Sequence, residues 1–319
     1  MRRLSILVLG LLLLACQPIA GSPTPATEGP TPTTDSETDM TDSEFTKLTY
    51  IAQGGQPTVN ARLEIDAAGQ ATLFSGSSWS VPPLLRNTVG NFGAALPAET
   101  FAALKAQIAD AGVLDLARQE RATSPDPTTR YLTIEQGSES YQFSLLDTSD
   151  EPALADLEQQ LVDIMTELLS EPVRALAVDL FLDESDAGLV PTVDLSQLGP
   201  EPLPLLLLEP DDANYFLRIS LVLEKETPVS GADPIWLPNR TIDLSREQVE
   251  AFVTEGVFPA GVHEMAPGAV YSLTLAPIQL PNDGATYALR PRVVFWFPGE
   301  GAARQMITVE TDRILLTEE

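Results

Sequence analysis

The sequence is poor in the residue types that build most catalytic and metal centres. Its 319 residues include one cysteine, Cys16, and one histidine, His263. A single histidine cannot supply the several imidazole ligands of a typical zinc centre, and a single cysteine cannot form a disulfide within the chain. We therefore predict no metal site, and we expect hydrophobic cores alone to hold the folded part together.

The chain also lacks the short motifs that bind phosphate groups or build a nucleophile. It contains no P-loop, no G-x-G-x-x-G and no G-x-S-x-G. A Ser-His-Asp triad would have to use His263, which stands in a stretch that reads as a turn, so we expect a surface histidine there. The sequence predicts no catalytic residue and no cofactor.

Basic residues are scarce, and acidic residues are abundant. The chain has 18 lysines and arginines against 46 aspartates and glutamates, and only three of the basic residues are lysines. Binding to nucleic acid requires clustered lysine and arginine, so nucleic acid is excluded as a partner. We interpret the acid as a soluble, self-repelling surface, while attraction of cations or basic proteins and adaptation to salt remain alternatives.

The first fifteen residues have the three parts of a secretory signal. Arg2 and Arg3 precede an apolar run over 4–14, and the small residue Ala15 follows it. Eleven helical residues span roughly 16 Å, about half of the hydrocarbon core of a bilayer. The segment is therefore too short for a permanent membrane span and is predicted to be cleaved.

The stretch Leu13-Leu14-Ala15-Cys16 resembles the lipobox of bacterial lipoproteins, in which an apolar residue stands three places before an obligatory cysteine and a small residue directly before it. The resemblance implies that residues 1–15 are a lipoprotein signal peptide and that Cys16 becomes a diacylglyceryl cysteine. Two or three acyl chains would give stable anchoring. We therefore expect a membrane anchor at Cys16, in the cell membrane or the outer membrane, with the folded part outside the cytoplasm.

Residues 16–43 are predicted to be a disordered tether. They are rich in Pro, Thr, Ser and acid, and Met40 is the only sizeable apolar side chain between Ile19 and Phe45. Such a segment cannot offset the entropy of ordering. The remaining length suggests two domains, which we place at 44–171 and 172–319.

The domain at 44–171 is predicted to be α+β, an antiparallel sheet with two helices on one face. The period of two and the turn residues predict strands, and steps of three and four predict helices. The strands are expected at 47–52, 61–65, 71–75, 130–135 and 141–146, and the helices at 97–111 and 151–169.

The domain at 172–319 is predicted to be mostly β, a sandwich of immunoglobulin-like general type. Alternation is clearest over 215–224. Further strands are expected at 175–182, 203–208, 269–275, 286–297 and 305–316. A capping box at Ser245 and the glycine Gly256 bound one predicted helix, at 246–255.

The connection over 77–97 is the best candidate for a surface that binds a partner. It shows no helix or strand period, yet it carries Trp79, Leu84, Leu85 and Phe92. These side chains either fold back onto the sheet, which we favour, or face a partner such as an envelope protein or a glycan.

Three runs of acidic residues in predicted turns raise the question of calcium. None has the spacing of an EF-hand loop, so solvated turn acids are the simpler interpretation. The runs lie at 147–151, 183–186 and 211–214.

The sequence as a whole favours a non-catalytic function. We predict a lipid-anchored extracytoplasmic protein that binds a ligand or supports an envelope assembly. The alternative is an extracytoplasmic hydrolase that uses two carboxylates, like a glycosidase. Two acids close together at the base of a cleft would favour the hydrolase, whereas an exposed apolar patch near Trp79 would favour the binding protein.

Overall fold

The computed structural model describes residues 45–55, 59–79, 86–110, 113–116, 128–145, 152–207, 218–231, 233–244, 261–298 and 304–316. Within it, Ser43–Glu319 form one compact unit. The fold is mostly β and is built from antiparallel sheets, as the sequence predicts for most of its elements. The predicted helix at 246–255 and the tether at 16–43 lie outside the described residues.

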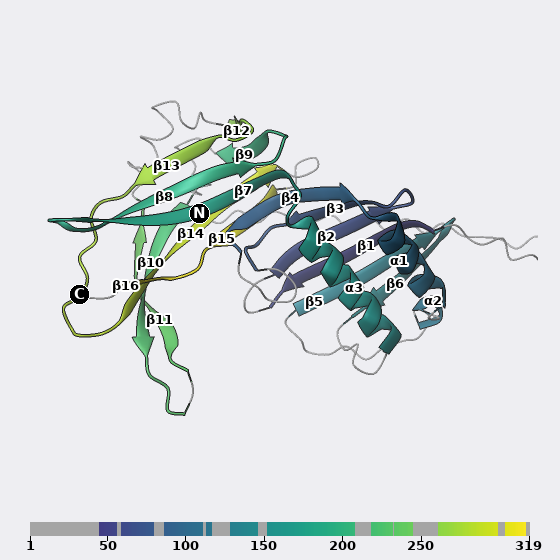
Figure 1. The fold of residues 1–319 in the computed structure, drawn as a ribbon, viewed down its shortest axis with the longest axis horizontal. Helices are drawn as coiled ribbons and strands as arrows, with labels where there is room; N and C mark the ends of the chain where they lie inside the picture. Colours follow the sequence, from purple (N-terminus) through teal and green to yellow (C-terminus); the bar gives the residue numbers. More distant parts are fainter. Residues whose placement is uncertain are drawn as a thin grey trace, which may run out of the picture. The chain divides into compact units, whose positions relative to one another are not determined.

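A nine-stranded antiparallel sheet runs through both halves of the chain, in the order β13-β8-β7-β4-β3-β2-β1-β5-β6 (Figure 1). The pairing of β4 with β7 joins strands from either side of the predicted boundary at residue 171. The strands of the sheet are β1 (Phe45–Gly54), β2 (Val59–Asp66), β3 (Gln70–Ser75), β4 (Thr88–Ala95), β5 (Thr128–Gln136), β6 (Glu139–Ser144), β7 (Pro172–Ser185), β8 (Gly188–Leu198) and β13 (Val270–Thr274).

A second sheet has the order β11-β10-β14-β9-β12, and two further strands pair with β14. The single predicted strand at 305–316 is in fact two strands, separated by Thr311-Asp312-Arg313. The strands of this sheet are β9 (Leu203–Leu207), β10 (Arg218–Thr227), β11 (Ile235–Asp243), β12 (Gly261–Met265), β14 (Tyr287–Pro298), β15 (Arg304–Glu310) and β16 (Ile314–Leu316).

Two hydrophobic cores lie on opposite faces of the nine-stranded sheet. The helices α1 (Ala98–Asp110) and α3 (Pro152–Leu168), with the short α2 (Val113–Leu116), cover β1 to β6 and enclose the first core (Figure 1). The apolar stripe of α3 is buried as its spacing predicts, and Leu157 and Leu161 are fully buried. The second core lies between β7, β8 and β13 on one side and β10, β14 and β15 on the other.

Strand β4 lies inside the segment 77–97, where the sequence analysis expected neither helix nor strand, so that expectation is wrong. Val89 belongs to the second core and Phe92 to the first, because the two faces of β4 serve different cores. A bulge between Asn91 and Phe92 breaks the register with β7. A strand that is buried on both faces and bulged does not show the simple period of two.

Gly90 allows β4 and β7 to approach each other. Its φ of +136° is one that residues with a side chain rarely adopt, and a Cβ atom there would lie 2.6 Å from both the Cα of Ala175 and the carbonyl oxygen of Arg174. Both neighbours are backbone atoms, so neither can turn aside. The pairing of β4 with β7 therefore requires glycine at this position.

We expect Gly90→Ala to lower the free energy of unfolding by at least about 3 kcal/mol, through backbone strain and overpacking together. Urea denaturation followed by tryptophan fluorescence measures the loss. Gly137→Ala is the matched control: its φ is +57° and no atom lies within 4 Å of the new Cβ, so about 1 to 2 kcal/mol is expected. Equal losses in the two variants would contradict the packing argument.

Candidate functional site

A pocket of about 500 Å³ opens where β7 continues past the start of β4. The first residue of β4, Thr88, pairs with Ala177, and beyond this point Asn87 and Arg86 are the described residues that continue alongside β7. The residues of this pocket come from the start of β4, from β7, from the end of α3 and from the connection between β15 and β16. The lining residues are Arg86, Asn87, Thr88, Leu169, Asp179, Leu180, Thr311, Asp312 and Ile314.

Arg86 supplies a cation to the wall of this pocket. Its Nε atom is buried and has no hydrogen-bond partner among the described residues. Leaving such a donor unpaired costs about 1 to 3 kcal/mol, and more for a charged group. Arg86 is held by its backbone, since its N–H donates to the carbonyl oxygen of Ser78 at 2.8 Å.

Two carboxylates lie opposite each other on β7 and β8, and one of them, Asp179, lines the pocket together with Arg86. Asp179 on β7 pairs in register with Asp194 on β8, so both side chains are on one face of the sheet. The amide of Asn87 donates to Oδ1 of Asp179 at 2.8 Å. The Oδ1 atom of Asp194 is buried and accepts no hydrogen bond from any described residue. Like charges directly opposite each other destabilise a sheet, so a cation bound at this pair would be stabilising.

Ser78 ties the two sides of the pocket together. Its backbone N–H donates to the carbonyl oxygen of Thr308 at 3.1 Å, and its hydroxyl accepts from the backbone N–H of Glu310 at 2.9 Å. Its carbonyl oxygen accepts from Arg86, as described above. A single residue, 1% exposed, therefore fixes both the start of the Arg86 segment and the end of β15.

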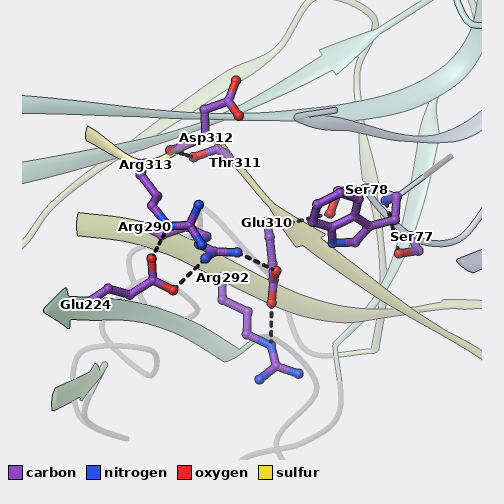
Figure 2. Close-up of polar contacts among 10 residues, drawn as sticks. Ser77, Ser78, Glu224, Arg290, Arg292, Glu310, Thr311, Asp312 and Arg313 are labelled. Atoms are coloured by element: carbon purple, nitrogen blue, oxygen red, sulfur yellow. Dashed lines mark hydrogen bonds and ion pairs between the residues drawn. The ribbon is translucent and has the colours of Figure 1, made fainter. Parts of the chain in front are cut away.

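A network of ion pairs holds the strands behind the β15–β16 connection (Figure 2). Glu224 of β10, 5% exposed, pairs with Arg290 of β14 and with Arg313. Arg290 donates a second hydrogen bond to Glu310 at 3.1 Å, and Arg292 lies 3.6 Å from the same carboxylate. Three guanidinium groups and two carboxylates from four segments are thus linked.

The network positions one wall of the pocket. Glu310 and Arg313 are both members, and Thr311 and Asp312 stand between them and line the pocket. Thr311 is 8% exposed, and its hydroxyl donates to the carbonyl oxygen of Asp312. The turn that carries Asp312 is therefore anchored on both sides by charged hydrogen bonds, which are stronger than neutral ones.

A second buried polar cluster lies in the first core, away from this pocket. The hydroxyl of Tyr50 and the guanidinium of Arg130 donate to the same oxygen of Glu158, at 2.8 and 2.9 Å. Burial raises the pKa of the Tyr50 phenol, and the negative charge of Glu158 adds to the shift. These bonds fix α3 to strands β1 and β5, and we assign the cluster to stability.

The residues predicted to bind a partner do not form one surface. Phe92 is 1% exposed and packs in the first core, which agrees with the favoured prediction that the side chain folds back and not with the alternative that it meets a partner. Trp79 is partly buried against the same core, and its backbone bridges to Val59. Leu84 and Leu85 lie outside the described residues, as does Cys16. Among the described residues, no exposed large apolar side chain belongs to 77–97.

The structure describes His263 and one of the three acidic runs that the sequence analysis considered as sites. His263 lies in strand β12, opposite Leu205, and not in a turn as expected. The acidic run at 183–186 forms the end of β7 and the turn to β8, whereas 147–151 and 211–214 lie outside the described residues. Within the described part of the chain, no group of three or more His, Cys, Asp and Glu could hold a metal ion.

The residues of the pocket were not singled out by the sequence analysis, although Arg86, Asn87 and Thr88 belong to the segment 77–97 that it proposed as a partner surface. The signal that could have found them is a basic residue beside polar ones inside an apolar connection of a very acidic chain. Asp179 and Asp194 carry no such signal, because their pairing depends on the register of β7 and β8.

Comparison with known proteins finds no family model, no curated protein and no solved structure that matches the chain. Among the helices of the described residues, none is both long enough and apolar enough to cross a membrane. The functional argument therefore depends on the geometry of the site itself.

We expect Arg290→Gln to lower the free energy of unfolding by about 3 kcal/mol, because Glu224 then keeps a buried charge with one partner fewer. The matched control is Arg218→Gln, in the exposed pair with Asp243 at 3.1 Å, where less than about 1 kcal/mol is expected. Hydrogen bonds from Ser220 and Arg218 lower the pKa of Asp243. Urea denaturation at neutral pH compares the two, and similar small losses would refute the role given to the network.

Proposed function

We propose that this protein is a lipid-anchored binding protein that acts outside the cytoplasm, and that it takes its ligand in the pocket at the edge of β7. The observation that carries this proposal is the buried Nε of Arg86, a charged donor without a partner among the described residues, on the wall of a pocket of about 500 Å³. Sites for small ligands have volumes of roughly 300 to 1,000 Å³ and a few well-placed polar groups.

The anchor is the part of the proposal that comes from the sequence. A diacylglyceryl group on Cys16 would hold the protein at the cell membrane or the outer membrane, and the segment 16–43 would space the folded body from the lipid. The tether has no basic residue and many acidic ones, so anionic lipid would repel it. An envelope protein or a glycan is the partner that this location suggests.

The finer description of the fold belongs to the same proposal. We infer an α+β domain over 44–171 and a β-sandwich domain of immunoglobulin-like type over 172–319. The two hydrophobic cores, which follow this division closely, support it. The nine-stranded sheet that crosses residue 171 implies that the two parts fold in contact with each other.

The lipid anchor predicts a specific modification. When cells that express the full chain are grown with an alkyne analogue of palmitate, the protein should carry the label and fractionate with membranes. Cys16→Ser should lose the label and the membrane association, because the only thiol of the chain is gone. Label that persists in Cys16→Ser would show that the anchor is elsewhere or is not acyl-linked.

The pocket predicts saturable binding that a bulky side chain at its rim should block. We would screen the detergent-solubilised full chain by thermal shift against amino acids, short peptides and oligosaccharides, since a ligand that binds only the folded state raises the melting temperature. Asp312→Trp, at an exposed lining residue, should abolish the shift. Asp156→Trp, on the exposed side of α3, should retain it. A shift that survives in Asp312→Trp would place the ligand elsewhere.

The alternative of a carboxylate-dependent hydrolase is favoured by one observation, the placement of Asp179 opposite Asp194. Hydrolysis of glycosides needs two carboxyl groups a few ångströms apart, on either side of the scissile bond. Release of a chromophore from aryl glycosides by the wild-type chain, lost in Asp179→Asn, would replace the binding function by this one. Binding without turnover would retain the proposal.

A further inference from the structure

The pocket is lined by residues of both charges, and Arg86 and Asp179 come from segments that lie side by side. Extending the β4–β7 register by two residues sets Arg86 opposite Asp179, and the bond from the N–H of Val178 to the carbonyl oxygen of Asn87, 2.9 Å, supports this extension. The planar guanidinium of arginine matches a carboxylate through two parallel hydrogen bonds. The buried Nε of Arg86 has no hydrogen-bond partner among the described residues, so this donor could serve a ligand.

The acidic side of the pocket suits a positively charged group of a ligand. The carboxylate of Asp179 lines the pocket, and the amide of Asn87 donates to its Oδ1 at 2.8 Å. Asp194 pairs with Asp179 in register from β8 and is not one of the lining residues, so it adds negative charge beside the pocket. An ammonium group, with three donors, suits a carboxylate in this position. The same pocket therefore offers a place for an anion and a place for a cation.

The remaining wall and the charge of the whole chain restrict the ligand further. Leu180 and Ile314, which both pack beside the second core, give the pocket an aliphatic part, and Leu169, beside the first core, is a further apolar lining residue. The formal net charge of the chain is −28, and a field of this sign opposes the approach of a simple anion. A ligand that carries a carboxylate but no net charge avoids this repulsion.

We propose that the pocket binds a short zwitterionic peptide, with its terminal carboxylate on Arg86, its terminal ammonium at Asp179, and an aliphatic side chain against Leu180 and Ile314. This inference rests on the proposed binding function and names the class of ligand. A volume of about 500 Å³ is suited to a di- or tripeptide and not to a folded partner.

Isothermal titration calorimetry of the detergent-solubilised full chain tests the inference. It compares the affinities of altered ligands for the unaltered protein. The probes are the dipeptide Leu-Leu, its C-terminal amide and its N-acetyl form. Each blocked form should bind at least about tenfold more weakly than Leu-Leu, because it loses one charged hydrogen-bonded contact. Equal binding of all three would overturn the inference and leave the binding function standing.

Variants test the two contacts separately. Arg86→Gln should weaken Leu-Leu at least about tenfold but leave its amide nearly unchanged, since the amide no longer has the carboxylate that Arg86 binds. Arg86→Lys keeps the charge but not the planar fork and should fall between the two. Arg218→Gln, in an exposed pair, is the control and should bind like the wild type. A thermal melt of each variant verifies that it is folded.

The outcomes of these experiments distinguish failure of the peptide inference from failure of the proposed binding function. If Leu-Leu does not bind, but another compound gives a thermal shift that Asp312→Trp abolishes, the ligand class is wrong and the pocket remains a binding site. If Leu-Leu binds equally well to wild type, Arg86→Gln and Asp312→Trp, the peptide binds elsewhere and the inference falls. If Leu-Leu and the whole screen give no shift, both the inference and the proposed function are overturned.

Discussion

The close approach of β4 and β7 at Gly90 is the constraint on which the rest of the structure depends. Because nothing projects from the α-carbon of Gly90, the backbone at Ala175 can come within contact distance. The sheet then continues from the helix-covered strands to those that pack on the second sheet. One face of the paired strands closes the first core and the other face closes the second. The pocket follows from the same geometry, because β7 is longer than the partner that Gly90 lets it accept.

The C-terminal wall of the pocket, at Thr311 and Asp312, is held in position by ion pairs. The turn at Thr311 and Asp312 is bounded by Glu310 and Arg313, which form ion pairs with Arg290 and Glu224 of the network. Buried ion pairs contribute little net stability when compared with apolar packing, but removing one member is costly. Such a network specifies a position more than it adds stability. We interpret it, together with Ser78, as the device that keeps the wall of the pocket in place.

Much of the fold could be predicted where a strand or helix buries one face only. The stripe of α3 and the alternation around Leu221 gave correct elements for this reason. Strand β8 was missed because its buried face includes Pro191 and Gln197, and the amide of Gln197 is satisfied by three carbonyl oxygens and by the N–H of Gly268. Strand β11 was missed because it is an edge strand with little burial on either face.

The candidate site could not be predicted from the sequence, because its residues meet through strand register. Asp179 and Asp194 are 15 positions apart and become neighbours only when the β7–β8 hairpin sets them opposite each other. Thr311 and Asp312 come from the other sheet. The sequence does show the excess of acidic residues. Because of this excess, a basic residue without an ion pair, such as Arg86, is noticeable once the structure is known.

Two arginines in this structure have a buried Nε without a hydrogen-bond partner among the described residues, and they call for opposite interpretations. Arg290 uses its other nitrogens to bind Glu224 and Glu310, so its charge is already compensated within the protein. Arg86 binds neither of these acids nor another described one, although the chain has 46 acidic residues to choose from. Arg174 and Arg240 are exposed, and water can solvate them. Arg86 is thus a half-buried guanidinium on the wall of a pocket that forms no ion pair with any described acid, and the proposed ligand would supply the missing charge.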